Sequence, residues 1–312
     1  MSTTSRELWY RLWLLAALVA LTTLALLGSY TGVHDGAVPL ASSTAPGVLD
    51  VDTAKDALLR AEQDAELDAA SDAAGTSSFS TQVAVANQIL TSAAAEDVTG
   101  ATGRLTLKTV TGLISAYSYW IGLAGQVPAR SPLHAGYMED AADVLGRPGD
   151  PVTGSSLMSR LNALQQAQVA VVHRQAAFGW PLALGWCVSG TLVVALAAAL
   201  AEAHRFHRTR FRRRWNRQLA AAGVLLVGGA AVLGTFTWQT HSGLFHARRL
   251  LERPHAGPGI STAGADVARR MADTGFRAAA AGWIVAGGVA LMVLVVWALA
   301  PRIGEYRVKV SR

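Results

Sequence analysis

Residues 278–300 read AAAAGWIVAGGVALMVLVVWALA, an apolar run without a single charged side chain. The hydrocarbon core of a bilayer is about 30 Å thick and is crossed by roughly 20 helical residues. Lipid offers no hydrogen-bond partner to backbone N–H and C=O groups, so such a run must satisfy them within a helix. The segment therefore predicts a transmembrane helix.

Three further segments have the same character, namely residues 12–29, 178–200 and 218–238. The whole chain of 312 residues is 51% hydrophobic and only 15% charged, which is a membrane composition. Soluble domains carry roughly 25% charged residues. The single cysteine excludes a disulfide within the chain. We expect an all-α protein with four transmembrane helices.

Five polar segments remain outside these spans, at residues 1–11, 30–177, 201–217, 239–277 and 301–312. The segment 201–217 contains seven arginines, and short arginine-rich loops stay on the cytoplasmic side of a membrane. Because consecutive segments alternate between the two sides, 30–177 and 239–277 are predicted to be extracytoplasmic. The expected location is the cell membrane, with several passes and a large extracytoplasmic domain.

Residues 1–29 also allow a second interpretation, as a cleaved signal peptide. Arg6 and Arg11 precede an apolar run, as they do in secretory signals. The run is longer than the roughly 7 to 15 apolar residues of such signals, and no small-x-small cleavage site directly follows it. Retention as an anchor is favoured, whereas cleavage would leave three spans.

The long segment 30–177 has the periodicity of helices. Apolar residues recur at spacings of three and four in 79–93 and 107–124, which indicates a seam of a and d positions. We predict an up-and-down four-helix bundle, inserted between spans 1 and 2. Breaks are expected at Pro46-Gly47 and within Pro148–Pro151, with the last helix continuing into the second span. The four predicted helices cover residues 50–73, 77–97, 104–126 and 133–177.

The segment 239–277 repeats this plan on a smaller scale. Residues 239–253 and 261–277 are compatible with helices and are separated by PHAGPG at 254–259. The last two spans are therefore expected to extend outward as short arms. The opening helix of the long segment is strongly acidic and is expected to face the arginines of these arms or a cationic partner. Its acidic residues are Asp50, Asp52, Asp56, Glu62, Asp64, Glu66, Asp68 and Asp72.

The sequence contains no motif that indicates an enzyme. It has no GxSxG, Walker, Rossmann or kinase pattern, and its histidines lack the spacing of metal ligands. No Asp, Glu, Lys or Arg lies within a predicted span, whereas ion and proton carriers usually need one there. We expect no catalytic residue, no metal, no cofactor and no nucleic-acid partner, and the lipid bilayer is the expected surrounding.

Three aromatic residues on the helix 104–126 are candidates for contact with a partner, namely Tyr117, Tyr119 and Trp120. Residues two apart on a helix do not share a face, so at most two of them can point inward. One should be exposed, and exposed aromatics often anchor a contact. The alternative is an aromatic ring that covers the core.

Two other groups of residues have expected roles. Arg208, Arg212, Arg213 and Arg214 in the loop 201–217 are candidates for contact with a cytoplasmic partner or anionic lipid. Ala278, Gly282, Ala286 and Ala290 lie four residues apart in the last span. Small residues at this spacing let two helices approach closely, so we expect them to form a packing seam.

The layout resembles the extracytoplasmic four-helix-bundle modules of bacterial chemoreceptors and sensor kinases. Those proteins carry large cytoplasmic output domains, whereas the inner segments here have 11, 17 and 12 residues. The chain also resembles the four-span actinobacterial proteins that relay the state of an amino-acid-binding lipoprotein to a cytoplasmic Ser/Thr kinase. That resemblance rests on the helical insert, the arginine-rich loop, the arginines of 239–277 and the tail Pro301–Arg307. No functional residue can be carried over from either family.

These observations lead to two hypotheses of different classes. The first is a non-enzymatic sensor that binds a solute or a solute-binding protein outside and signals to a cytoplasmic partner, such as a kinase. The resemblance to bundle sensors implies a homodimer. The alternative is a structural or assembly subunit of a membrane transporter or envelope complex. A channel would need a polar lining, which the spans lack.

Overall fold

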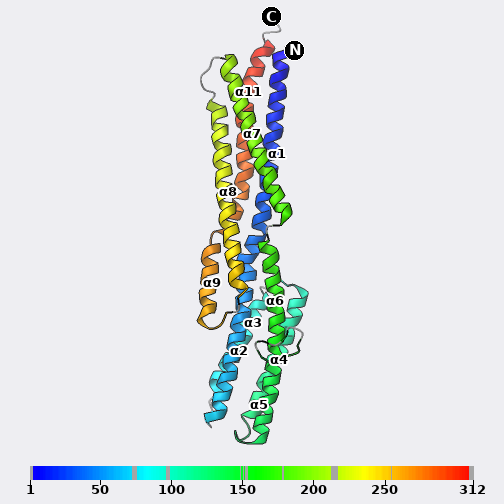
Figure 1. The fold of residues 1–312 in the computed structure, drawn as a ribbon, viewed down its shortest axis with the longest axis vertical. Helices are drawn as coiled ribbons and strands as arrows, with labels where there is room; N and C mark the ends of the chain where they lie inside the picture. Colours follow the sequence, from blue (N-terminus) through cyan, green and yellow to red (C-terminus); the bar gives the residue numbers. More distant parts are fainter. Residues whose placement is uncertain are drawn as a thin grey trace. The chain divides into compact units, whose positions relative to one another are not determined.

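The computed structural model describes residues 3–71, 76–95, 99–147, 149, 151, 154–177, 179–211, 217–253 and 255–308. These residues are almost entirely helical and contain no strand, which confirms the predicted all-α class (Figure 1). The chain divides into two compact units. The first unit consists of Met1–Val38, Phe178–Ser242 and Asp273–Arg312, and the second of Pro39–Ala177 and Gly243–Ala272.

The first unit contains the apolar segments. Its helices are α1 (Thr3–Pro39), α7 (Trp180–Phe211), most of α8 (Arg217–Leu251), α10 (Thr274–Ala279) and α11 (Ala281–Val308). In the described part of the chain, four helical stretches are long and apolar enough to cross a membrane. They include the predicted spans, although Phe178, at the predicted start of the second, lies outside the described residues.

The four long helices of the first unit lie beside one another (Figure 1). Each contributes to one cluster of buried side chains, for example Val19 of α1, Leu196 of α7, Leu226 of α8 and Val295 of α11. Several tryptophans are exposed instead, including Trp180 at 77%. Exposed indoles near the ends of apolar helices are typical of membrane interfaces. The first unit therefore fits a multi-pass membrane protein.

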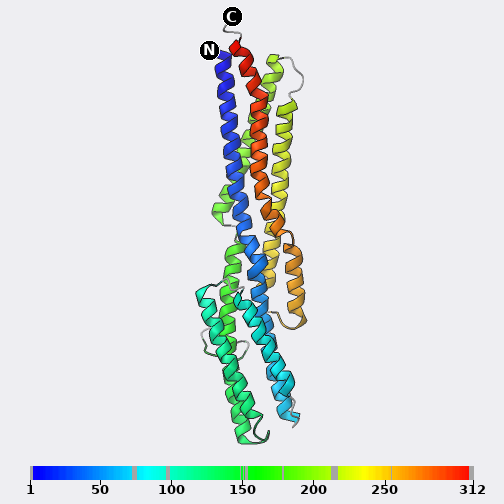
Figure 2. The ribbon, with the colours of Figure 1, turned by 180° about the vertical axis from the view of Figure 1, so that it is seen from behind.

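The second unit is built from α2 (Ala45–Ser71), α3 (Thr76–Ala95), α4 (Ala101–Ala124), α5 (Pro132–Leu145), α6 (Leu157–Ala176) and α9 (Pro258–Met271). Helices α2 and α3 lie side by side, as do α4 and α5 (Figure 2). One core cluster draws on α2 to α6 and includes Val83, Leu90, Leu107 and Val110. These are positions of the predicted apolar seams, so the a and d pattern located the core correctly.

The predicted break at Pro46-Gly47 is wrong. Residues 3–71 form a continuous series of helical residues, in which α1 is followed by a short π-helix, η1 (Leu40–Thr44), and then by α2. In η1 the N–H of Ala45 donates to the carbonyl of Leu40, five residues back. Pro46 lacks an N–H and its ring crowds the carbonyl four residues earlier, and the wider π-turn relieves this conflict.

The break within the last predicted helix is confirmed, because α5 ends at Leu145 and α6 begins at Leu157. The predicted continuation into the second span is wrong. Helix α6 ends at Ala176, Ala177 has an extended backbone, and α7 begins at Trp180. Pro181 at the second position of α7 suits a helix start, since a proline there displaces no intrahelical hydrogen bond.

Candidate functional site

The three predicted contact aromatics lie on α4 in different environments. Tyr117 is buried, with 1% of its surface exposed, and its ring centroid lies 5.8 Å from that of Phe79. Tyr119 is 61% exposed, so one aromatic does point outward as expected. Trp120 packs between Tyr119 and Tyr137, with centroid distances of 5.6 and 5.9 Å. Tyr117 is therefore a core residue, whereas Tyr119 and Trp120 are available for contact.

The predicted arginine contacts fall largely outside the described structure. Helix α7 ends at Phe211. Arg212, Arg213 and Arg214 lie outside the described residues, as does the side chain of Arg208. Their contact with a cytoplasmic partner stays a prediction from the sequence.

Within the described chain, most of the expected packing seam on the last span is not covered by another helix, so its packing role stays a prediction. Gly282, Ala286 and Ala290 are exposed within the chain, and a Cβ added at Gly282 would meet no atom within 4 Å. Ala278, the fourth member, belongs to α10 and is half-buried. Helix α11 instead turns another face inward, which carries Gly288 among its buried residues. The spacing of four was correct for a helix face but did not identify which face is covered.

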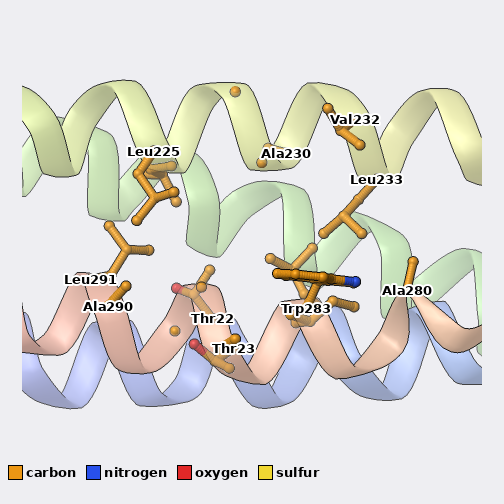
Figure 3. Close-up of a pocket in the computed structure, with 18 of the residues that line it drawn as sticks. Thr22, Thr23, Leu225, Ala230, Val232, Leu233, Ala280, Trp283, Ala290 and Leu291 are labelled. Carbon is orange, nitrogen blue, oxygen red and sulfur yellow. The ribbon is translucent and has the colours of Figure 1, made fainter.

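Ala286 and Ala290 border an apolar cavity of about 520 Å³ in the first unit. Figure 3 shows Thr22 and Thr23 along one side of this cavity. Trp283 lies toward the end of the cavity that is marked by Ala280. The hydroxyls of the two threonines donate to their own helix, to the carbonyls of Leu18 at 2.6 Å and Val19 at 2.8 Å. Because both hydroxyls donate to backbone carbonyls of their own helix, they leave the lining of the cavity largely apolar, which suits a hydrocarbon chain.

Helix α1 holds its neighbours through polar contacts that the sequence pattern did not reveal. The hydroxyls of Ser29 and Ser189 are 3.0 Å apart, which links α1 to α7. The hydroxyl of Tyr30 donates to the carbonyl of Arg277 in α10 at 2.5 Å. The partners are 160 and 247 residues apart in the sequence, so no local signal could have paired them.

His34 continues this row and is 3% exposed. Its Nδ1 lies 2.9 Å from the carbonyl oxygen of Tyr30, and its Nε2 lies 3.2 Å from the hydroxyl of Thr240 in α8. A carbonyl can only accept, so Nδ1 carries the proton and, in the neutral ring, Nε2 accepts from Thr240. This histidine fixes α1 against α8 in a defined tautomer.

The second unit contains a buried polar cluster that is the strongest candidate for a functional site. The Nε2 of Gln165 in α6 donates to Oδ1 of Asp52 in α2 at 2.7 Å. The Nζ of Lys55 in α2 donates to Oε1 of the same Gln165. Beyond the carboxylate, Nδ1 of His255 lies 3.7 Å from Oδ2 of Asp52. The four groups therefore follow one another in space as the ammonium of Lys55, the amide of Gln165, the carboxylate of Asp52 and the imidazole of His255.

Burial dominates the electrostatics of this cluster. It raises the pKa of Asp52, while the hydrogen bond from Gln165 and the charge of Lys55 act in the opposite direction. Burial also lowers the pKa of Lys55, and the charge of Asp52 opposes this. Removing a charged group from water disfavours its charged form, so both residues are held closer to neutrality than in solution.

Two further contacts hold the connection between α8 and α9. The backbone N–H of Gly257 donates to Oδ1 of Asp56 at 3.1 Å, and Gly257 has a φ of +54°, a region that favours glycine. At the end of α8, Oε1 of Glu252 lies 2.9 Å from Nε2 of His173 in α6. The acidic opening helix thus faces the 239–277 segment as expected, and Asp52 and Asp56 meet an imidazole and a backbone amide there.

The groups in contact within the cluster are a carboxylate, an ammonium, an amide and an imidazole. The amide of Gln165 acts only as a hydrogen-bond donor and acceptor between the two residues of α2. Among the described side chains, no group of three or more His, Cys, Asp or Glu residues could hold a metal ion. Asp52 was one of eight acidic residues of the predicted opening helix, and only its place among α2, α6 and His255 distinguishes it.

Comparison with known proteins assigns the chain to no family. No protein-family model, no curated protein and no solved structure matches the chain. The described part of the chain has two main features: four helical stretches able to span a membrane, and a second helical unit in which a buried carboxylate lies near an imidazole.

Proposed function

We propose that this protein is a non-enzymatic transducer in the cell membrane, with residues 30–177 and 239–277 outside and the arginine-rich loop inside. A change in helix packing around the buried cluster of Asp52 would be its input. The output would be read by a cytoplasmic partner that docks on the loop 201–217 and the tail 301–312. The resemblance to the actinobacterial four-span proteins makes a kinase the expected partner.

One observation supports this proposal: Asp52 and Lys55 of the cluster lie in the same continuous run of helical residues as the first candidate span. Residues 3–71 are helical from the first span through η1 to Asp52. Helix α8 runs from Arg217 to Leu251 and so includes both the third span and the residues that precede His255. A rigid helix passes a rotation or shift along its length, whereas a flexible linker would absorb it.

A ligand can drive such a change only if it binds two packing arrangements with different affinity. The exposed Tyr119 and the half-buried Trp120 provide a surface on which a solute-binding protein could dock. Binding there would favour one arrangement of α4 against α2 and α6. This surface is the proposed external contact.

Helix phase provides the test. One alanine inserted after Ser242 in α8 turns all following residues by about 100°, whereas seven inserted residues make close to two full turns. Photo-crosslinkers at Arg208 and Glu305 would first identify the cytoplasmic partner in native membranes. We expect the single insertion to change the activity of that partner and the seven-residue insertion to preserve it.

The control separates the two hypotheses. If the partner binds equally to both insertion variants and its activity follows neither, the chain serves as an assembly subunit and the transducer proposal fails. Absence of any cytoplasmic protein crosslinked at either position would also contradict it. Immunoblotting confirms that both variants reach the membrane in equal amounts.

A further inference from the structure

The apolar cavity of the first unit is long and narrow. Along α8 its lining runs from Leu225 to Phe236, and along α10 and α11 it runs from Phe276 to Leu291. At a rise of about 1.5 Å per residue, the stretch from Leu225 to Phe236 is about 16 Å long. A cylinder of this length that holds the 520 Å³ of the cavity is about 6 Å across.

The cavity lies mostly in one half of the apolar segments. Most of its lining on α8 follows the middle of the predicted span 218–238, and most of its lining on α11 precedes the middle of the span 278–300. On α1 it includes Val19 to Leu26, again toward the end at which the sequence continues into the second unit. Half of a hydrocarbon core of about 30 Å is about 15 Å. The length of the cavity therefore matches the depth of one leaflet.

Glycines leave space between the walls of the cavity. A Cβ added at Gly228, Gly229 or Gly287 would meet no described atom within 4 Å, so no side chain from the facing wall fills these positions. Gly288 has the opposite surroundings, because a Cβ there would collide with the side chain of Thr23. Helices α1 and α11 are thus in contact at one side of the cavity, while the space between α8 and α11 is open.

Water is a poor occupant of this space. A buried water needs about two to four polar partners. The polar side chains of the lining are Thr22 and Thr23, and both hydroxyls donate to carbonyls of their own helix. The remaining side chains of the lining are aliphatic or aromatic. An empty space is also unfavourable, because the atoms of its walls lose van der Waals contacts.

The width of the cavity decides between two apolar occupants. An α-helix with its side chains is about 10 to 12 Å across, so a helix of a second copy is too wide. A hydrocarbon chain is a single file of methylene groups and is thin enough. Lipid chains surround every helix that crosses a bilayer, so this occupant is available wherever the cavity opens toward the membrane.

The cavity does open sideways. Val232 of α8 and Trp283 of α11 both line it, and they are 52% and 76% exposed (Figure 3). Leu226 and Ile284, on the same two helices, also line the cavity but are buried. A lipid chain can therefore enter between α8 and α11 and contact side chains that lipid on the outer surface of the helices does not reach.

We propose that this cavity binds one acyl chain of a membrane phospholipid, which lies between α8 and α11 along the depth of a single leaflet. The headgroup end lies at Ala280, near the beginning of the predicted span 278–300, and the terminal methyl group lies toward Leu225 and Leu291. The inference goes beyond the proposed function and depends only on the membrane location of the first unit. With the orientation proposed above, the leaflet is the outer one.

Photo-crosslinking in lipid nanodiscs tests the site. The full-length protein is reconstituted with a phosphatidylglycerol that carries a diazirine in one acyl chain, and tandem mass spectrometry locates the labelled residues after illumination. We expect Leu226 and Ile284, which are buried in the cavity, to be labelled several-fold more than Leu15 and Val295, which are buried outside it. Equal labelling of the two pairs overturns the proposal.

Two positions of the diazirine test the direction of the acyl chain. A diazirine close to the ester should label Phe236 and Ile284, whereas one close to the terminal methyl group should label Leu226 and Leu291. Labelling of both ends of the cavity to the same extent by both probes would contradict a chain that lies along one leaflet.

Matched glycine substitutions either fill the cavity or leave it open. Gly228→Leu and Gly287→Leu place a side chain in the cavity and should reduce the labelling of its buried residues to that of buried residues elsewhere. Gly234→Leu and Gly282→Leu lie on the same two helices in equally open surroundings but do not line the cavity, so they should keep the wild-type labelling. Unchanged labelling in the two filled variants overturns the proposal. If those variants do not reach the membrane, the wild-type pattern decides.

A helix of a second copy is the competing occupant. Val232→Cys, in a Cys187→Ala background, places a thiol at the opening of the cavity. If another copy filled the cavity, this variant would form a disulfide-linked dimer in membranes, and the buried residues of the cavity would stay unlabelled by lipid. That result overturns the proposal, as does an unlabelled cavity without such a dimer.

Discussion

Tyr117 combines a core position with a buried polar atom. Its ring packs against Phe79 in the centre of the second unit, but its hydroxyl is buried without a partner among the described residues. Burial raises the pKa of Tyr117 further above its ordinary value, and the charges of Glu62 and Glu66 add to this effect. The residue is therefore a neutral phenol, and none of the described residues makes a hydrogen bond with its O–H.

We predict that Tyr117→Phe stabilises the protein by about 1 kcal/mol, because a buried unpaired hydroxyl costs about 1–3 kcal/mol. Tyr117→Ala should instead cost about 3–5 kcal/mol, since it leaves a cavity in the core. Urea unfolding of both variants in detergent micelles measures the two changes. A loss of stability in Tyr117→Phe would reveal a partner for the hydroxyl.

Asp52 and Asp56 illustrate how two residues of one type acquire different roles. Asp56 accepts from a backbone amide and from Arg60, whereas Oδ2 of Asp52 lies 3.7 Å from an imidazole nitrogen of His255. Both were predicted to lie on an acidic helix. Their roles differ because α6 and the connection between α8 and α9 cover Asp52 more deeply.

At the scale of the element, two adjacent glycines of α11 have opposite surroundings. A Cβ added at Gly288 would lie 2.4 Å from Oγ1 and 2.6 Å from Cγ2 of Thr23 in α1. Thr23 is β-branched and its hydroxyl is bonded to its own helix, so it has little freedom to move aside. A Cβ at Gly287 would meet no atom within 4 Å. Gly288 is therefore the point where α11 approaches α1 most closely among the glycines of that helix.

We predict opposite effects for the same substitution at these two neighbours. Gly288→Ala should destabilise the first unit by about 1–3 kcal/mol through overpacking. Gly287→Ala should be neutral or stabilising by up to about 1 kcal/mol, because alanine favours the helix and the added methyl group has room. Thermal unfolding in the same detergent compares the pair. Equal effects would contradict the close approach of α1 and α11.

The π-helix η1 shows that a proline can alter an element without ending it. Proline usually marks a helix boundary because it removes a hydrogen bond and crowds the preceding turn. In this chain, one widened turn at Leu40–Thr44 accommodates Pro46, and the helical residues continue into α2. Helices that continue past the spans are what the proposed function requires.

For the whole molecule, the main consequence concerns the two sides of the membrane. The four helices able to span a bilayer fit a multi-pass protein. The proposed function adds that the second unit is outside and that the arginine-rich loop is inside.

We predict that a membrane-impermeant maleimide labels Thr109→Cys and Ser261→Cys on intact cells, in a Cys187→Ala background. Both positions are exposed in the second unit. Thr209→Cys, in the arginine-rich loop, should be labelled only after permeabilisation. Mass spectrometry of the labelled chain reads the outcome. The reverse pattern would place the second unit in the cytoplasm and would refute the proposed orientation.

The sequence by itself determined the helical class, the four apolar segments and the core seams of α3 and α4. These features depend on local periodicity and on the length of uncharged runs, and both can be read directly from the amino-acid sequence. The break between α5 and α6 was predictable for the same reason, because its glycine and prolines act on their own backbone.

Only the tertiary structure decided which face of α11 is covered, how Pro46 is accommodated and that Asp52 is buried among the acidic residues of α2. His34 and Thr240 are in contact although they are 206 residues apart in the sequence. Asp52 likewise lies beside His255, which comes much later in the sequence. Such contacts depend on how helices pack in three dimensions. A polar residue on an amphipathic helix has the same local sequence whether water or another helix covers it, so burial and its effect on proton affinity appear only after folding.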